Sequence, residues 1–151
     1  MSKDKDPLDE MLDLAFTLTN SSFKYYDKAA KKAEMSEVKA LLAVIAESES
    51  NLLIQLRHMM LTGIVDELEE LKQAKDRDEL PDETPFDPSR AKSDPRIFVC
   101  NKTLKKEVKG YTFFLTLAAR ANTTLVSRLF EYLAHLKMRQ IKRIRRVCST
   151  Y

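Results

Sequence analysis

The sequences Phe23-Lys24-Tyr25-Tyr26 and Tyr111-Thr112-Phe113-Phe114 lie 88 residues apart, and their alignment decides the fold. The same offset, without a gap, pairs small and apolar residues of the two halves: Ala30 with Ala118, Ala33 with Ala121, Val38 with Val126, Leu41 with Leu129 and Ala46 with Ala134. Because the offset never changes, the turn inside each half must have one length. The sequence therefore predicts two related helical hairpins in tandem.

Apolar residues recur with a period of 3.6 in four stretches, which indicates four amphipathic helices. The predicted ranges are about 7–33, 36–62, 102–121 and 124–147. Asp6 and Pro7 are suited to cap and begin the first helix, and Gly63 is suited to end the second. Few glycines and many Ala, Leu, Lys and Glu residues favour long helices throughout.

Four prolines and many acidic residues between 76 and 95 predict a long loop that joins the hairpins. Residues 64–75 either extend the second helix or form a short separate one. Short turns within each hairpin and one long crossover between them are typical of an all-α four-helix bundle. We expect one domain over 1–151, with hairpin 1 at about 7–62, an extension and linker at 63–98, and hairpin 2 at about 99–148.

Composition places limits on location. The chain has 151 residues, of which 44% are hydrophobic, and it contains no run of 18 apolar residues. We therefore expect no membrane span. The polar N-terminal residues lack the apolar core of a signal peptide, so we expect a cytoplasmic protein.

Charge divides the chain into an acidic and a basic part. Residues 1–99 hold 14 Lys/Arg and 21 Asp/Glu, a net charge of −7, whereas residues 100–151 hold 12 and 2, a net charge of +10. The basic residues cluster most densely near the C-terminus, at Arg139, Lys142, Arg143, Arg145 and Arg146. Pairing within the molecule is the first interpretation, and docking of nucleic acid or another acidic partner is the alternative.

Two cysteines, Cys100 and Cys148, flank the second hairpin at similar distances from its turn. A disulfide at one end of the hairpin is one alternative. Two free thiols is the default expectation, because disulfides are rare in the cytosol.

The hairpins resemble the rubrerythrin branch of the ferritin-like superfamily. In that family the first helix of each hairpin carries Glu-x-x-Ala-x-x-Phe-Tyr, and the second carries Leu-Ala-x-x-Glu-x-x-His. The matching stretches here are Glu107-x-x-Gly110-x-x-Phe113-Phe114 with Leu133-Ala134, and Ser22-x-x-Tyr25-Tyr26 with Ile45-Ala46-x-x-Glu49. The resemblance implies a ferritin-like bundle in which four carboxylates and two imidazoles hold two iron or manganese ions.

Four of the six implied ligand positions depart from that pattern. Thr19 stands in place of Glu, Leu52 in place of His, and Lys137-x-x-Gln140 in place of Glu-x-x-His. Only Glu49 and Glu107 remain. An ammonium group a few ångströms from a divalent ion costs several kcal/mol at any plausible interior dielectric. We therefore predict that the di-metal centre is lost and that no cofactor or catalytic residue is present.

A lysine on an apolar stripe needs an anion nearby. We expect a buried polar cluster at the former metal site, made of Glu49, Glu107, Lys137, Gln140 and Thr19. The resulting prediction is a non-catalytic binding or structural protein that forms a homo-oligomer, expected to be a dimer. The alternatives are an iron- or manganese-dependent ferroxidase or peroxidase with a rebuilt site on Glu49 and Glu107, and a basic adaptor for nucleic acid.

Overall fold

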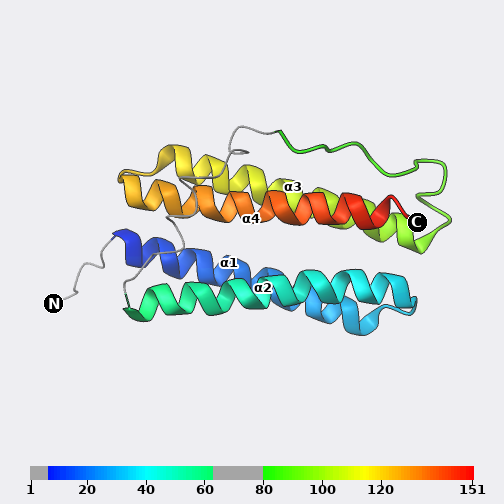
Figure 1. The fold of residues 1–151 in the computed structure, drawn as a ribbon, viewed down its shortest axis with the longest axis horizontal. Coiled ribbons are helices and arrows are strands. Elements are labelled where there is room, and N and C mark those ends of the chain that lie inside the picture. The colour runs from blue at the N-terminus through cyan, green and yellow to red at the C-terminus, as the bar shows by residue number, and fades with distance from the viewer. Residues whose placement is uncertain (1–6, 63–79) are drawn as a thin grey trace. The chain divides into compact units, whose positions relative to one another are not determined.

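The structure is a computed structural model that describes residues 7–62 and 80–151. These residues form four helices and no strand (Figure 1), so the all-α prediction is confirmed. The helices are α1 (Pro7–Lys32), α2 (Ser36–Thr62), α3 (Pro95–Arg120) and α4 (Thr124–Cys148). None of them is long and apolar enough to cross a membrane. Residues 64–75, which were expected either to extend the second helix or to form a short separate one, lie outside the described residues.

The chain divides into two compact units, Met1–Glu69 and Glu70–Tyr151. In the first, α1 packs on α2, and in the second, α3 packs on α4. Each unit is thus one helical hairpin. The prediction that both belong to one ferritin-like bundle stays a prediction.

The boundaries of the helices confirm the internal repeat. α1 and α3 begin at Pro7 and Pro95 and end at Lys32 and Arg120, while α2 and α4 begin at Ser36 and Thr124. Every one of these pairs is separated by 88 residues, the offset found in the sequence. The two turns therefore have one length, as expected.

The third helix begins seven residues earlier than the sequence predicted. We expected it to start at about Lys102, with the linker reaching residue 98, but α3 begins at Pro95. The side chain of Asp94 accepts a hydrogen bond from the backbone N–H of Arg96, and Pro95 occupies the first helical position. Both features favour a helix start, because the first N–H groups of a helix have no partner inside it.

Apolar residues at helical spacing form the core of each hairpin. In hairpin 1 the fully buried side chains include Leu12, Tyr26, Ile45, Leu56 and Met59. In hairpin 2 they include Phe130, Leu129, Leu133, Ile141 and Ile144. The Phe130 ring stacks on Phe114 with the ring centroids 6.1 Å apart. These stripes turn the polar positions considered next towards the helix interface.

Candidate functional site: a buried lysine–glutamate pair

The five residues predicted to form a polar cluster are divided between the two hairpins. Thr19 and Glu49 lie on α1 and α2, and Glu107, Lys137 and Gln140 lie on α3 and α4. Four of them are buried, with exposed fractions of 3% for Thr19, 3% for Glu49, 0% for Glu107 and 5% for Gln140. The Lys137 side chain is 11% exposed.

Hairpin 2 brings Glu107 and Lys137 together. The Lys137 Nζ lies 2.8 Å from Glu107 Oε2. Glu107 belongs to the α3 stripe that includes Leu104 and Tyr111, and Lys137 follows Leu133 on α4, so both face the helix interface. The predicted cluster also places Glu49 close to Lys137. That contact would join the two hairpins and stays a prediction.

Gly110 makes room for the lysine. A Cβ atom added at this position would lie 3.2 Å from Lys137 Cε, which is closer than most Cβ contacts in proteins, and 3.4 Å from Cδ. Glycine inside a helix costs about 0.5–1 kcal/mol relative to alanine. The close approach of the Lys137 chain accounts for this residue, which the sequence showed only as a departure from the alanine of the family pattern.

Some buried polar atoms of Glu107 and Gln140 have no hydrogen-bond partner among the described residues. Within the described part of the chain, the buried atoms Glu107 Oε1 and Gln140 Nε2 have no hydrogen-bond partner. A half-satisfied polar group in a low-dielectric interior destabilises the fold unless something else offsets it. The ion pair with Lys137 supplies that compensation for the carboxylate, because it neutralises the charge within the same hairpin.

In hairpin 1 the buried carboxylate has a different kind of partner, a hydroxyl group. Ser22 donates a hydrogen bond from its hydroxyl to Glu49 Oε1 over 3.3 Å. In the repeat, Ser22 corresponds to Gly110 and Glu49 corresponds to Lys137. The small residue therefore stays on the first helix of each hairpin, whereas the acid changes helix: Glu49 lies on the second helix of hairpin 1, and Glu107 lies on the first helix of hairpin 2.

In the residues that the structure describes, neither hairpin by itself carries a donor set that fits a di-metal centre. Over residues 7–62 and 80–151, no group of three or more His, Cys, Asp or Glu side chains is placed to hold a metal ion. Of the two carboxylates left from the family pattern, Glu107 is paired with an ammonium group and Glu49 accepts from a hydroxyl. A metal ion at Glu107 would have to displace Lys137.

The cysteines of hairpin 2 form a disulfide, so the default expectation of two free thiols is wrong. Cys100 near the start of α3 is bonded to Cys148 at the end of α4, and their Cα atoms are 6.1 Å apart. Both residues are buried, at 0% and 2% exposed. The antiparallel packing of α3 on α4 brings the two ends together, as the alternative interpretation of their spacing required.

The basic residues near the C-terminus differ in their exposure and in their contacts. Arg145 is bound within the hairpin: its Nε lies 3.1 Å from Asp82 Oδ2, and its Nη1 donates to the carbonyl oxygens of Asp82 and Thr84. Arg139, Lys142 and Arg146 are exposed, and Arg143 is half-buried. Spacings of three and four residues place the exposed three on the outer side of α4.

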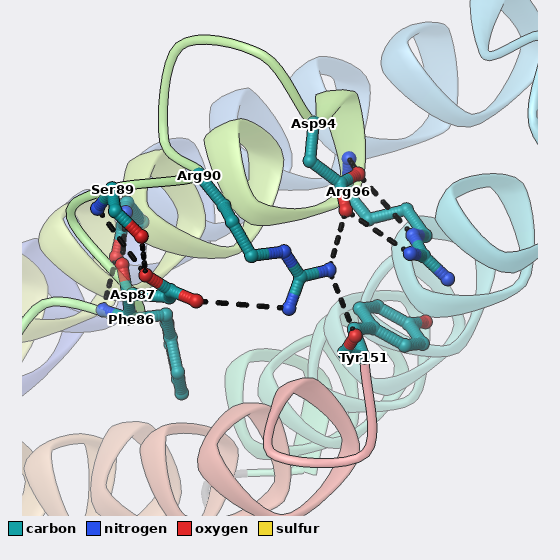
Figure 2. Close-up of polar contacts among 8 residues, drawn as sticks. Phe86, Asp87, Ser89, Arg90, Asp94, Arg96 and Tyr151 are labelled. Carbon is teal, nitrogen blue, oxygen red and sulfur yellow. Dashed lines mark hydrogen bonds and ion pairs between the residues drawn. The ribbon is translucent and has the colours of Figure 1, made fainter.

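A second polar cluster, which the sequence analysis missed, surrounds Asp94 at the disulfide-linked end of hairpin 2 (Figure 2). The Asp94 carboxylate lies 2.6 Å from Arg90 Nη2 and 3.0 Å from Arg96 Nη2. Arg90 also donates to the Tyr151 carbonyl over 2.9 Å, and the Arg96 guanidinium lies 5.5 Å from the Tyr151 ring centroid. The signal was present, since Asp94-Pro95 repeats Asp6-Pro7 at the common offset.

These contacts favour the ionised form of two aspartates. Hydrogen bonds from Arg96 and then from Arg90 hold the pKa of Asp94 well below its usual value. The pKa of Asp82 is also lowered, first by the side chain and backbone amide of Thr84 and to a smaller extent by the charge of Arg145. Both carboxylates are therefore charged at neutral pH and hold the segment before α3 against the hairpin.

Comparisons with known proteins add no relative. No protein-family model matches the chain, no curated protein matches it, and no solved structure matches it. The resemblance to the rubrerythrin pattern therefore depends on the residues quoted above.

Proposed function

We propose that this chain is a ferritin-like protein of the rubrerythrin type that has lost its di-metal centre and acts as a non-catalytic binding or structural protein, assembled as a homodimer. Its two hairpins would pack as one bundle through the faces that carry the polar residues. The tandem hairpins with identical turns and the aromatic and alanine framework support the ferritin-like part of the proposal.

The observation that carries the loss of the metal is the 2.8 Å contact between Lys137 Nζ and Glu107 Oε2. In the family pattern Lys137 stands where a carboxylate ligand belongs. Two divalent ions carry about four positive charges in total, and four carboxylates balance this charge in such centres. Here Glu49, Glu107 and Lys137 would contribute a net charge of only −1, and the ammonium group already neutralises Glu107.

Elemental analysis tests this proposal. The chain is produced in medium supplemented with iron and manganese, and its metal content is compared with that of Glu107→Ala and Glu49→Ala variants. We expect well under one metal ion per chain in all three proteins. Two ions per chain that disappear in either variant would instead support the alternative, an oxidoreductase with a rebuilt site.

A second candidate function, a basic adaptor for nucleic acid, is favoured by the exposed cations on the outer side of α4. Arg139, Lys142 and Arg146 are exposed, whereas Arg145 is held by Asp82 and Thr84. If this surface binds phosphates, the logarithm of the affinity falls linearly with the logarithm of salt concentration. Reversing the charge at Arg139 and Arg146 should then weaken binding to a DNA duplex and lower that slope, while Lys24→Glu in hairpin 1 serves as the control.

A further inference from the structure

An extended segment of this chain, residues 82–86, is bound by two side chains of hairpin 2. The first is Asn101 on α3. Its Oδ1 accepts from the Phe86 backbone N–H over 2.7 Å, and its Nδ2 donates to the Phe86 carbonyl over 3.1 Å. One amide side chain therefore satisfies both backbone groups of one residue, which is how a neighbouring strand would recognise an extended peptide.

The second side chain is Arg145 on α4. Its Nη1 donates to the carbonyls of Asp82 and Thr84 over 3.0 and 2.9 Å, and its Nε faces the Asp82 carboxylate. Its guanidinium carbon lies 4.7 Å from the Phe86 ring centroid, within range of a cation–π contact. Arg145 thus contacts a carboxylate, two backbone carbonyls and an aromatic ring at once.

Most of these contacts involve groups that any extended peptide possesses. Only two side chains of the bound segment are recognised: a carboxylate at Asp82 and an aromatic ring four residues later at Phe86. Proline at positions 81 and 85 favours the extended conformation without a need for other partners. The recognised chemistry is therefore a carboxylate and an aromatic ring on a backbone that the prolines keep extended.

The backbone positions of Asn101 and Arg145 are fixed independently of the segment. Asn101 follows Cys100, and Arg145 lies one helical turn before Cys148, so the disulfide holds the two helices together beside both residues. The segment itself lies at the surface, where residues 82–85 are exposed and the Asp82 side chain is 58% exposed. A fixed receptor and an exposed occupant are what exchange with another peptide requires.

We propose that Asn101 and Arg145 form a docking surface for an acidic, extended peptide of a partner protein, and that residues 82–86 occupy this surface as an internal competitor. The partner peptide would carry a carboxylate followed four residues later by an aromatic ring. Binding in trans would displace residues 82–86, so the partner peptide has to compete with the internal segment for the same surface.

A peptide competition experiment tests the proposal. The probe is a fluorescent peptide with the sequence of residues 80–89, and binding to the full chain is measured by anisotropy. The Asp82→Ala/Phe86→Ala variant should bind it on the order of 10-fold more tightly than the unmodified chain, because the covalently attached competitor acts at an effective concentration near the millimolar range. Adding Arg145→Ala or Asn101→Ala to that variant should abolish binding.

Controls keep the result decisive. A scrambled peptide of the same composition should not bind, and circular dichroism should show unchanged helix content, since both substitutions lie outside the helices. In the unmodified chain, millimolar peptide should also shift the NMR signals of the Asn101 side-chain amide. Absence of saturable binding to the variant and of this shift, equal binding of the scrambled peptide, or insensitivity to Arg145→Ala would overturn the proposal.

Discussion

Hairpin 1 and hairpin 2 share one helical plan and differ in how their interiors hold charge. Hairpin 1 buries Glu49 and offers it a hydroxyl from Ser22, whereas hairpin 2 buries Glu107 and offers it an ammonium group from Lys137. Hairpin 2 also has a disulfide where the repeat places Leu12 and Met60 in hairpin 1. The comparison teaches that a repeated backbone plan tolerates different polar chemistry at equivalent positions when each buried carboxylate has a partner within its own hairpin.

The largest expected effect comes from removing one member of the buried pair. Lys137→Met leaves the fully buried Glu107 carboxylate without its cation, and should lower the free energy of unfolding by about 3–5 kcal/mol. Glu107→Gln should cost less, because Lys137 is partly exposed and can extend towards water. Denaturant titration of the single variants measures both changes.

The Glu107→Gln/Lys137→Met double variant serves as the matched control for that comparison. Replacing a whole buried pair by uncharged groups is often nearly neutral. We expect the double variant to lie closer to the unmodified protein than Lys137→Met does. A double variant that loses the sum of the two single effects would show that the residues do not interact.

Loss of the disulfide should have the next largest effect, and only in hairpin 2. Cys100→Ser/Cys148→Ser removes a link that closes a loop with a sequence separation of 48, which is worth about 2–4 kcal/mol. Hydrogen exchange of backbone amides should show weaker protection in α3 and α4 and unchanged protection in α1 and α2. Equal loss of protection in both hairpins would contradict a local effect of the disulfide.

Gly110→Ala sharpens the comparison at a smaller scale. Alanine should gain about 0.5–1 kcal/mol from helix propensity, but its Cβ would press on the Lys137 chain. We expect no gain in the unmodified protein and the full gain in a Lys137→Ala background. Thermal unfolding of the four proteins measures the coupling, and Ser22→Ala at the equivalent position of hairpin 1 should be insensitive to Lys137.

The smallest effect concerns Asp94 and depends on pH. Because the pKa of Asp94 is lower in the folded protein than the value of about 3.9 in an unfolded chain, its stabilising contribution is complete above that value. The contribution is lost as the pH falls through the folded pKa. Asp94→Asn should therefore lower the Tm at pH 6, and the difference should shrink below about pH 4. A difference that is independent of pH would contradict the charged role of Asp94.

Much of the fold could be predicted because the repeat constrains it. The constant offset required matching turns, and the structure has them at 33–35 and 121–123. The same offset applied to Asp6-Pro7 would have placed the start of α3 at Pro95. Pro95 was instead predicted to belong to the proline-rich loop that also contains Pro81, Pro85 and Pro88.

The polar site was less predictable. The apolar stripe predicted that Lys137 faces inward, and the family resemblance predicted the same for Glu107. The partner of Lys137 depends on the rotation of α3 against α4, which neither of them gives. The spacing of Cys100 and Cys148 was compatible with a disulfide, yet spacing does not determine oxidation. The contacts of Arg145 with residues 82–86 join parts of the chain more than 50 residues apart, and no local sequence pattern predicts such contacts.

A titration with Mn²⁺ and Fe²⁺ tests most directly the claim that Lys137 stands in the place of a metal ligand. The unmodified chain is compared with a Thr19→Glu/Leu52→His/Lys137→Glu/Gln140→His variant, in which all six ligand types of the family pattern are restored. We predict no saturable binding by the unmodified chain and binding of about two ions by the restored variant. Two ions bound at micromolar affinity by the unmodified chain, or none by a restored variant that retains its helices, would contradict the account.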